Sequence, residues 1–262
     1  MLPAEKFLPF PFESCYNELT EYSTKYPKEK ENILRKSQKI LEKGGTSMEM
    51  EGRMYKVYAR GDEKIQLKII PGHFVTSQSH ITHYLEMTTM KSRCSEAARI
   101  ARLLSARYEI TTPVDSIICL DGLEVIGAFL AEELAKAGVL SMNAHKTIYI
   151  VKPEFNANGQ VIFRDNIEHM VRGRNVVLLL SSITTGKTLR QCMESVLYYG
   201  GIIQGVSAIF SAVNKVAGLD INAVFYKQDI PDYESYAADQ CPMCRRKEKI
   251  DAIVNGYGYS KI

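Results

Sequence analysis

The segment from Val176 to Leu189 holds the residues best suited by type and spacing to bind a charged ligand. Five apolar residues are followed by Ser181-Ser182 and then by Thr184-Thr185-Gly186-Lys187-Thr188. The last five supply hydroxyl groups, an ammonium group and a glycine that lets the backbone approach a ligand closely. A helix starting here would add N–H groups without partners, which favour an anion. This combination suits a phosphate monoester, and the alternative is a turn whose threonines only cap the helix.

The neighbouring residues predict the elements that position this turn. The uninterrupted apolar run Val176–Leu180 is typical of a strand buried on both faces of a parallel sheet. Residues 188–199 carry apolar side chains at helical spacing, and Gly200-Gly201 marks the end of that helix. The turn between strand and helix therefore lies at the carboxyl edge of the sheet, where open α/β folds bind ligands.

The order of apolar strand, two variable residues and Ile183-Thr184-Thr185-Gly186-Lys187-Thr188-Leu189 resembles the ribose-phosphate loop of the phosphoribosyltransferases. In that family the loop binds the 5-phosphate of phosphoribosyl diphosphate (PRPP), so the resemblance implies this role for Thr184, Thr185, Gly186, Lys187 and Thr188. The family usually carries two adjacent acidic residues that hold the ribose hydroxyls. This chain has Ser181 and Ser182 there, which we interpret as ribose-facing residues.

A second segment resembles the orotate phosphoribosyltransferases in particular. Near their start these enzymes carry a segment of the form Phe-x-Leu-x-Ser-Gly-x-His-Ser-x-x-Tyr. Gln78 replaces the glycine of this pattern and Ile81 its second serine. In the family the segment helps to form the base-binding side of the site, and the alternative here is a partly buried turn. The residues that the resemblance assigns to the base side are Phe74, Ser77, His80 and Tyr84.

Two more turns are expected at the same edge of the sheet. Asp121-Gly122 follows a predicted strand from residue 114 to 120 and precedes a helix that runs to about Gly138. By resemblance this turn touches the diphosphate, although an ordinary β–α turn would have the same sequence pattern. Further on, Lys152 lies in a Tyr-x-x-Lys-x-Glu stretch similar to the start of the flexible catalytic loop of orotate phosphoribosyltransferases. The resemblance implies that Lys152 is catalytic, and the alternative is a solvated lysine at a strand end.

The histidines and cysteines give only a weak indication of a metal site. His73, His80 and His83 lie close together, but no tight helical pair or neighbouring cysteine accompanies them. Cys241 and Cys244 form one Cys-x-x-Cys pair, which supplies two zinc ligands where a structural site needs four. A zinc site closed by a second copy of the protein or by a distant histidine stays open as an alternative. A reduced surface thiol pair is the preferred interpretation.

The pattern of apolar runs along the chain predicts an α/β fold, and the resemblance implies that this fold is of the type I phosphoribosyltransferase kind. Apolar runs near residues 114, 147, 176, 202 and 221 alternate with helices, which indicates a doubly wound, mostly parallel sheet of about five strands. Helices are expected from about Ser14 and over 28–43, and a hairpin over 53–60 and 64–70. We predict three parts. Residues 1–70 form an N-terminal helical and hairpin extension that serves as a hood over the base. Residues 71–228 form a phosphoribosyltransferase-like domain, and residues 229–262 form an irregular C-terminal tail.

Composition excludes several classes of protein. The 262 residues carry a net charge of +3, which gives no case for nucleic acid binding. Neither an apolar run of membrane-spanning length nor a secretory leader is recognisable, so we expect no membrane contact and a soluble, cytoplasmic protein. The six scattered cysteines fit a reduced compartment. Motifs of serine hydrolases and zinc peptidases are missing, and Ser181 stands where a nucleotide-binding Walker loop needs glycine.

The resemblance implies a phosphoribosyltransferase of nucleotide metabolism, with an orotate-like pyrimidine as substrate. Such an enzyme transfers the phosphoribosyl group from PRPP to a nitrogenous base and releases diphosphate, with Mg²⁺ bound mainly through PRPP. It also implies a homodimer with these small molecules as its other partners. The alternative, which the pair Ser181-Ser182 motivates, is a weakened or inactive PRPP- or nucleotide-binding sensor or regulatory protein of the same fold.

Overall fold

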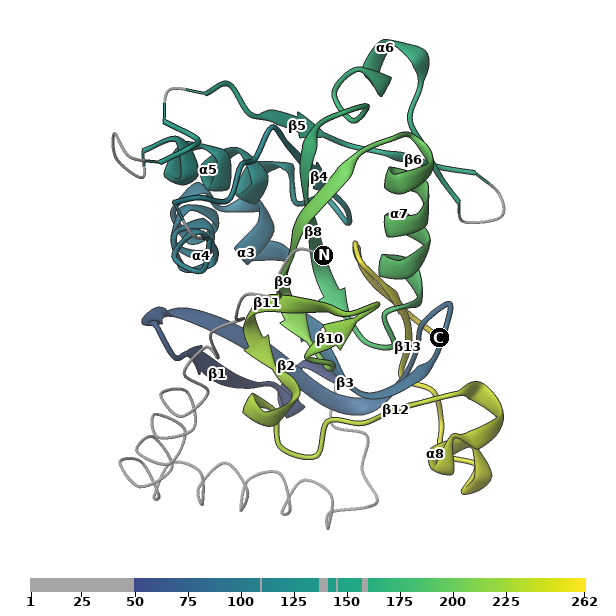
Figure 1. Ribbon diagram of the computed structural model, residues 1–262. Helices are drawn as coiled ribbons and strands as arrows, with labels where there is room; N and C mark the ends of the chain where they lie inside the picture. Colours follow the sequence, from purple (N-terminus) through teal and green to yellow (C-terminus); the bar gives the residue numbers. More distant parts are fainter. Residues whose placement is uncertain (1–49, 109, 137–140, 145, 157–159) are drawn as a thin grey trace, which may run out of the picture. The chain divides into compact units, whose positions relative to one another are not determined.

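The computed structural model describes residues 50–108, 110–136, 141–144, 146–156 and 160–262 (Figure 1). They belong to one compact unit, Glu49–Ile262. The helices predicted from about Ser14 and over 28–43 lie outside the described residues. The hairpin, the α/β core and the tail all fall within the single unit, and the role of the hairpin as a hood stays a prediction.

The central sheet has six strands in the order β10-β11-β9-β8-β4-β5 (Figure 1). Five of them pair in parallel, and β10 pairs antiparallel with β11 at the edge. The predicted α/β class with a doubly wound, mostly parallel sheet of about five strands is therefore confirmed. The strands are β4 (Ser116–Cys119), β5 (Tyr149–Val151), β8 (Asn175–Ile183), β9 (Ile202–Ser211), β10 (Lys215–Val216) and β11 (Leu219–Tyr226).

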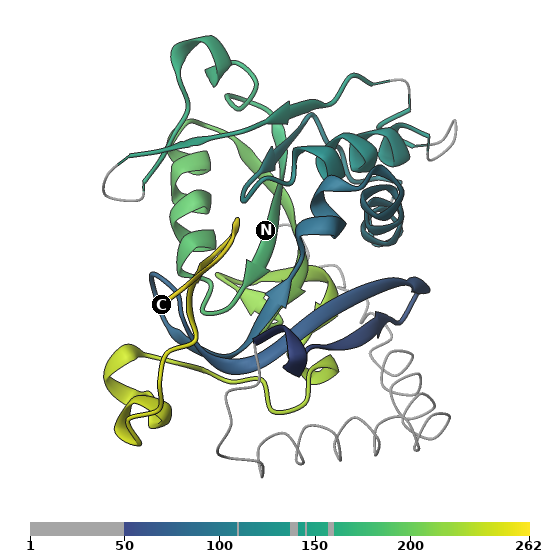
Figure 2. The ribbon, with the colours of Figure 1, turned by 180° about the vertical axis from the view of Figure 1, so that it is seen from behind.

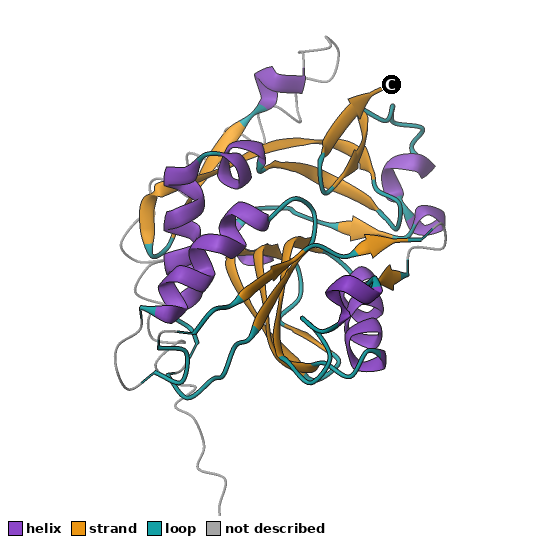
Figure 3. Ribbon diagram, turned by 90° about the horizontal axis from the view of Figure 1, so that it is seen from above, coloured by secondary structure: helices purple, strands orange, loops and turns teal. Residues whose placement is uncertain are grey.

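Both faces of β8 are buried, which explains its run of apolar residues. Val177 and Leu179 pack in one apolar cluster with side chains of α4 (Cys94–Ser105) and α5 (Glu124–Ala135). Val176, Leu178 and Leu180 pack in a second cluster with α7 (Lys187–Tyr198). Figure 3 shows these helices on opposite sides of the sheet. Since neighbouring residues of a strand face opposite ways, helices on both faces require apolar residues at every position.

The order in which the chain adds strands to the sheet reverses between β4 and β8. From β4 the chain passes to β5 on one side, whereas β8, β9 and β11 follow one another on the other side. The helices that follow β4 and β8 therefore cover opposite faces and diverge at the carboxyl edge of the sheet. In open α/β sheets this reversal opens a crevice in which ligands bind.

A second sheet, in the order β12-β3-β2-β13-β14 with β1 also paired to β2, joins distant parts of the chain. The predicted hairpin is confirmed as β1 and β2, which pair antiparallel. The expectation of an irregular tail is wrong, because β12 pairs with β3 and β13 pairs with β2. These tail strands are too short for a clear alternating pattern. The strands are β1 (Tyr55–Ala59), β2 (Asp62–Val75), β3 (His80–Glu86), β12 (Ser235–Tyr236), β13 (Ala252–Asn255) and β14 (Gly258–Lys261).

Short elements complete the unit. The loop after β5 forms a two-stranded hairpin of β6 (Glu154–Phe155) and β7 (Val161–Ile162). Seen from behind, the yellow C-terminal strands lie beside the blue β2–β3 hairpin, in agreement with the pairing of β13 and β2 (Figure 2).

Within the described ranges no helix has the length and apolar character needed to cross a membrane. The remaining elements are α3 (Thr88–Ser92), α6 (Asp165–Glu168), α8 (Pro242–Arg245) and three 3-10 turns, Met50–Arg53, Lys227–Asp229 and Ala238–Gln240.

Truncation of Leu178 tests the packing beneath α7. Leu178 is fully buried, whereas Leu197 on the outer side of α7 is 60% exposed. We expect Leu178→Ala to lower the free energy of unfolding by about 2–5 kcal/mol because it leaves a cavity. The same substitution at Leu197 serves as the control and should change it by no more than about 0.5 kcal/mol. Denaturant unfolding followed by circular dichroism measures both, and equal effects would contradict this packing.

Candidate functional site

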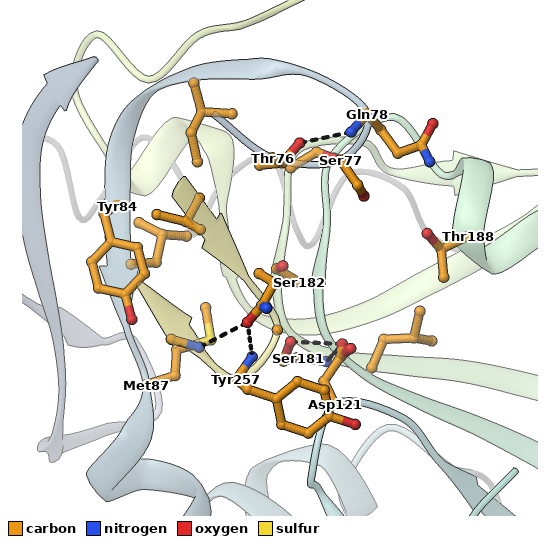
Figure 4. Close-up of a pocket in the computed structure, with 18 of the residues that line it drawn as sticks. Thr76, Ser77, Gln78, Tyr84, Met87, Asp121, Ser181, Ser182, Thr188 and Tyr257 are labelled. Carbon is orange, nitrogen blue, oxygen red and sulfur yellow. Dashed lines mark hydrogen bonds between the residues drawn. The ribbon is translucent and has the colours of Figure 1, made fainter. Parts of the chain in front are cut away.

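A pocket of about 330 Å³ lies at the carboxyl edge of the central sheet, where β4 and β8 diverge. Its wall combines the end of β8 and the turn after β4 with the β2–β3 turn, α3 and the β13–β14 turn of the second sheet. Figure 4 shows Tyr84 and Thr188 on opposite sides of this pocket, with Ser182 between them. The volume falls within the range of about 300–1,000 Å³ that is usual for small-molecule sites.

Asp121 and Ser181 form a hydrogen-bonded pair across the strand reversal. The Oδ2 atom of Asp121 accepts the hydroxyl of Ser181 at 2.7 Å and its backbone N–H at 3.3 Å (Figure 4). Regular pairing of β4 and β8 ends one residue before Asp121, where the N–H of Leu120 donates to the carbonyl oxygen of Leu179. Asp121 and Gly122 both have a positive φ, which turns the chain away from the sheet. The carboxylate therefore continues the contact between β4 and β8 into the pocket.

Lys91 of α3 lines the pocket and links the two sheets. Its ammonium group donates to the carbonyl oxygen of Asp121 at 3.1 Å and also to that of Gly256. Burial lowers the pKa of Lys91, although the negative charge of Asp121 acts in the opposite direction. A Cβ atom at Gly256 would lie only 2.3 Å from Oδ1 of Asp121, so this position requires glycine. The result is a partly buried lysine and a carboxylate at one end of the pocket.

The turn between β8 and α7 supplies the polar wall. Gly186 precedes α7 with a φ of 76°, a conformation that favours glycine. A Cβ atom there would lie 2.7 Å from a methyl carbon of Val216 on β10, so the turn fits closely against that edge strand. Thr184 and Thr188 line the pocket, while Thr185, Gly186 and Lys187 belong to the same turn but not to the lining. The first N–H groups of α7 thus lie beside two threonines, which suits an anion.

The opposite part of the pocket is apolar. Tyr84 contributes an aromatic ring, and burial raises the pKa of its phenol, which therefore keeps its proton. An apolar wall next to polar groups suits a ligand that carries both a flat ring and a phosphate. Further apolar residues of the lining are Ile81, Leu85, Met87, Phe155, Leu180, Tyr233 and Val254.

The structure separates the residues that the sequence assigned to the base side. Ser77 and Tyr84 line the pocket. Phe74 is fully buried in the core between the sheets. His80 lies outside the lining, and its Nδ1 atom faces Nε2 of His73 at 3.0 Å.

The residues assigned to the ribose and the diphosphate mostly meet at the pocket. Ser181, Ser182 and Asp121 line it, and Gly122 follows directly in the turn. Lys152 does not line the pocket. Its ammonium group forms an ion pair with Glu124 at 3.2 Å, at the start of α5.

Sequence reasoning missed the contribution of the C-terminal hairpin and of Lys91. Asn255 and Tyr257 line the pocket from the β13–β14 turn. The dipeptide Asn255-Gly256 between apolar residues is a hairpin signal and would have indicated this turn. Nothing in the local sequence marks Lys91, because its burial depends on residues far along the chain.

Comparisons with known proteins agree with the two motifs. No family model matches the chain. The orotate phosphoribosyltransferase of Pelotomaculum thermopropionicum is 26% identical over 190 residues, 72% of this chain and 90% of the relative. That of Sphingopyxis alaskensis is 25% identical over 181 residues, 66% of this chain and 83% of the relative. The chain is therefore similar to orotate phosphoribosyltransferases, as its sequence motifs indicated.

Among solved structures, the orotate phosphoribosyltransferase from Aeropyrum pernix matches 61% of this chain and 88% of its own, with a TM-score of 0.44 and 18% identity. The Mycobacterium tuberculosis orotate phosphoribosyltransferase in complex with PRPP matches 56% of this chain and 82% of its own, with a TM-score of 0.38 and 17% identity.

Substitution of Gly186 tests the turn at the polar wall. We expect Gly186→Ala to destabilise the protein by about 2–4 kcal/mol, because it adds both backbone strain and a clash with Val216. Val216→Ala would make room for the added methyl group. The double variant should therefore lose less stability than the sum of the losses in the two single variants. It should still carry the backbone strain at position 186. Thermal unfolding of all four proteins measures this, and additive effects would contradict the close approach to Val216.

Proposed function

We propose that this protein transfers the phosphoribosyl group of PRPP to a ring nitrogen of orotate or a closely related pyrimidine and releases diphosphate. The observation that carries the proposal is the composition of the pocket at the strand reversal. One wall carries Thr184 and Thr188 at the start of α7, and the opposite wall is apolar around Tyr84. The similarity of the chain to proteins named orotate phosphoribosyltransferase supports the same assignment.

The 5-phosphate would bind at the start of α7. The N–H groups of the first helical turn and the positive end of the helix dipole favour a dianion there. The hydroxyl groups of Thr184 and Thr188 line the adjacent wall and can donate to phosphate oxygens. Gly186 allows the backbone to turn so that these groups converge.

The ribose would lie over Asp121 and Ser181. The carboxylate of Asp121 supplies the negative charge that Ser181-Ser182 lacks, and it lies in the pocket. During the reaction the bond from C1 of the ribose to the diphosphate oxygen breaks, and its electron pair leaves with the diphosphate. A bond from C1 to the base nitrogen forms, and the proton of that nitrogen passes to the released diphosphate or to water. Positive charge develops on the ribose ring between these events, and a nearby carboxylate stabilises it.

The diphosphate would be held beside Lys91 and the turn Asp121-Gly122. The ammonium group of Lys91 already touches the carbonyl oxygen of Asp121 and is close enough to this turn to attract a phosphate oxygen. The carboxylate of Asp121 suits Mg²⁺, a hard cation that prefers oxygen ligands and phosphates. When bound to PRPP, Mg²⁺ would neutralise charge on the departing diphosphate.

Two further parts of the sequence interpretation belong to this proposal. Lys152 would assist the departing diphosphate only after it leaves its ion pair with Glu124, because the pair holds it outside the pocket lining. The neighbouring β6–β7 hairpin contributes Phe155 to the lining, so this region adjoins the site. A homodimer is proposed on the resemblance alone.

The second candidate is a sensor or regulatory protein that binds PRPP or a nucleotide without turnover. The serine pair at the end of β8 favours it, because hydroxyl groups accept ribose hydroxyls less strongly than carboxylates and stabilise a developing cation poorly. Loss of such a charge-assisted bond costs about 1.5–3 kcal/mol, or roughly tenfold to a hundredfold in rate.

Phosphorus NMR of the protein with PRPP and Mg²⁺ tests the proposed reaction. We expect free diphosphate to appear when orotate is added and not with adenine, the matched control base. Shifted or broadened PRPP resonances without diphosphate release would favour the sensor. Unchanged PRPP resonances under all conditions would contradict both candidates.

Aspartate substitutions at the serine pair separate two positions that look alike in sequence. Asp at 181 would place a second carboxylate within hydrogen-bonding distance of Asp121, since Ser181 Oγ lies 2.7 Å from Oδ2. The two charges would repel each other. We therefore expect Ser182→Asp to raise kcat/KM about tenfold and Ser181→Asp to lower it.

The same pair of variants is informative if no transfer occurs, with PRPP affinity measured by calorimetry in place of kcat/KM. We again expect the Ser182→Asp variant to bind PRPP more tightly than the Ser181→Asp variant. The reverse order would contradict the assigned position of Asp121.

A further inference from the structure

Two histidines and two cysteines converge at one point outside the pocket lining. Nε2 of His73 lies 3.6 Å from Sγ of Cys241 and 3.6 Å from Sγ of Cys244. Nδ1 of His80 lies 3.3 Å from Sγ of Cys244 and 3.0 Å from Nε2 of His73. All four ligand atoms lie within 4.8 Å of one another.

The three nitrogen–sulfur distances match the edges of a tetrahedron around zinc, whereas the two ring nitrogens lie slightly closer together. With Zn–S bonds of about 2.3 Å and Zn–N bonds of about 2.1 Å, the ligand atoms of such a site lie about 3.3–3.8 Å apart. Two thiolates and two imidazoles are a donor set that selects zinc over magnesium or calcium, which prefer oxygen. Four protein ligands complete the coordination sphere, so the site would be structural and not catalytic.

Strand pairing brings the four residues together. His73 lies near the end of β2 and His80 begins β3, on the two sides of one hairpin. The tail segment that carries the cysteines leaves from β12, where Tyr236 pairs with His80, and returns through β13, where Ala252 pairs with Phe74. Between these points Cys241 is the N-cap residue of α8, and Cys244 follows three positions later inside this helix.

Neighbouring groups hold His73 in the orientation that a ligand needs. Its Nδ1 atom lies 3.1 Å from the backbone carbonyl oxygen of Glu248. A carbonyl oxygen only accepts, so Nδ1 carries the proton and Nε2 presents its lone pair to the cysteines. The backbone N–H of His73 donates to Asp251 at 2.9 Å, and Asp251 is in turn paired with Arg53.

Burial distinguishes this cluster from a reduced thiol pair on the surface. Cys241 is fully buried, and His73 and His80 are 3% and 9% exposed, whereas Cys244 is exposed. Thiols are weak hydrogen-bonding groups, so the two sulfur atoms gain little from the neighbouring imidazoles without a cation. We propose that His73, His80, Cys241 and Cys244 bind one structural zinc ion.

The zinc ion would fix two walls of the pocket. Thr76, Ser77 and Gln78 lie in the chain between the two histidines and line the pocket. The tail continues from the cysteines to the β13–β14 turn, which lines it from another side. A metal that ties the β2–β3 hairpin to the tail therefore orders both turns. Binding would release the thiol protons, since zinc takes the thiolate form.

Metal content of the wild-type protein tests the site directly. Untagged protein is purified under reducing conditions without chelators, and its zinc is measured by plasma mass spectrometry. We expect about one zinc ion per chain. Zinc at the level of the buffer, also after incubation of the reduced protein with zinc sulfate, would overturn the proposal. An intact mass lower by two hydrogens, from a Cys241–Cys244 disulfide in freshly purified protein, would overturn it as well.

Two matched cysteine variants locate the metal. Cys244 and Cys94 are both exposed, but Cys94 begins α4 and lies outside the cluster. Cys244→Ser should lose zinc to a chromophoric chelator much faster than the wild type, and Cys94→Ser should not. Cobalt substitution should give thiolate-to-metal absorption that is weaker in Cys244→Ser only. Equal zinc release from both variants and the wild type would contradict the assigned ligands.

Discussion

The reversal of strand order between β4 and β8 is the constraint on which the candidate site depends. Because β4 and β8 pair in parallel, both of their β–α turns reach the same edge of the sheet. Because their helices cover opposite faces, the space between the turns stays open for a ligand. The bond from Asp121 to Ser181 spans this space and replaces the backbone pairing that ends there. Moving either strand by one residue would remove the carboxylate from the pocket.

The second sheet closes the pocket and is itself assembled from distant segments. Its β2–β3 hairpin and its tail strands each contribute a turn to the lining. Lys91 joins the two sheets, because it donates to the carbonyl oxygens of both Asp121 and Gly256. The side chain of Asp121 leaves no room for a side chain at position 256. A zinc ion between the hairpin and the tail would hold the same two turns from the far side, so one metal would stabilise the shape of the site without touching the ligand.

The sequence predicted the parts of this structure that depend on local patterns. Val176–Leu180 indicated a strand buried on both faces, and Gly186 indicated the turn before α7; both are where they were expected. The position of Asp121 opposite Ser181 could not be predicted, since it follows from the pairing of β4 with β8. The surroundings of Lys91 depend on Gly256, which lies 165 positions away. The same holds for the histidines and cysteines, because 168 positions separate His73 from Cys241 and no local pattern connects them.

The most direct test of the central claim is a crystal structure of the protein with PRPP and Mg²⁺. The account predicts the 5-phosphate at the first N–H groups of α7, between Thr184 and Thr188, and the ribose over Asp121 and Ser181. The diphosphate should lie beside Lys91. PRPP bound elsewhere, or a phosphate at the apolar wall near Tyr84, would contradict the assignment of this pocket.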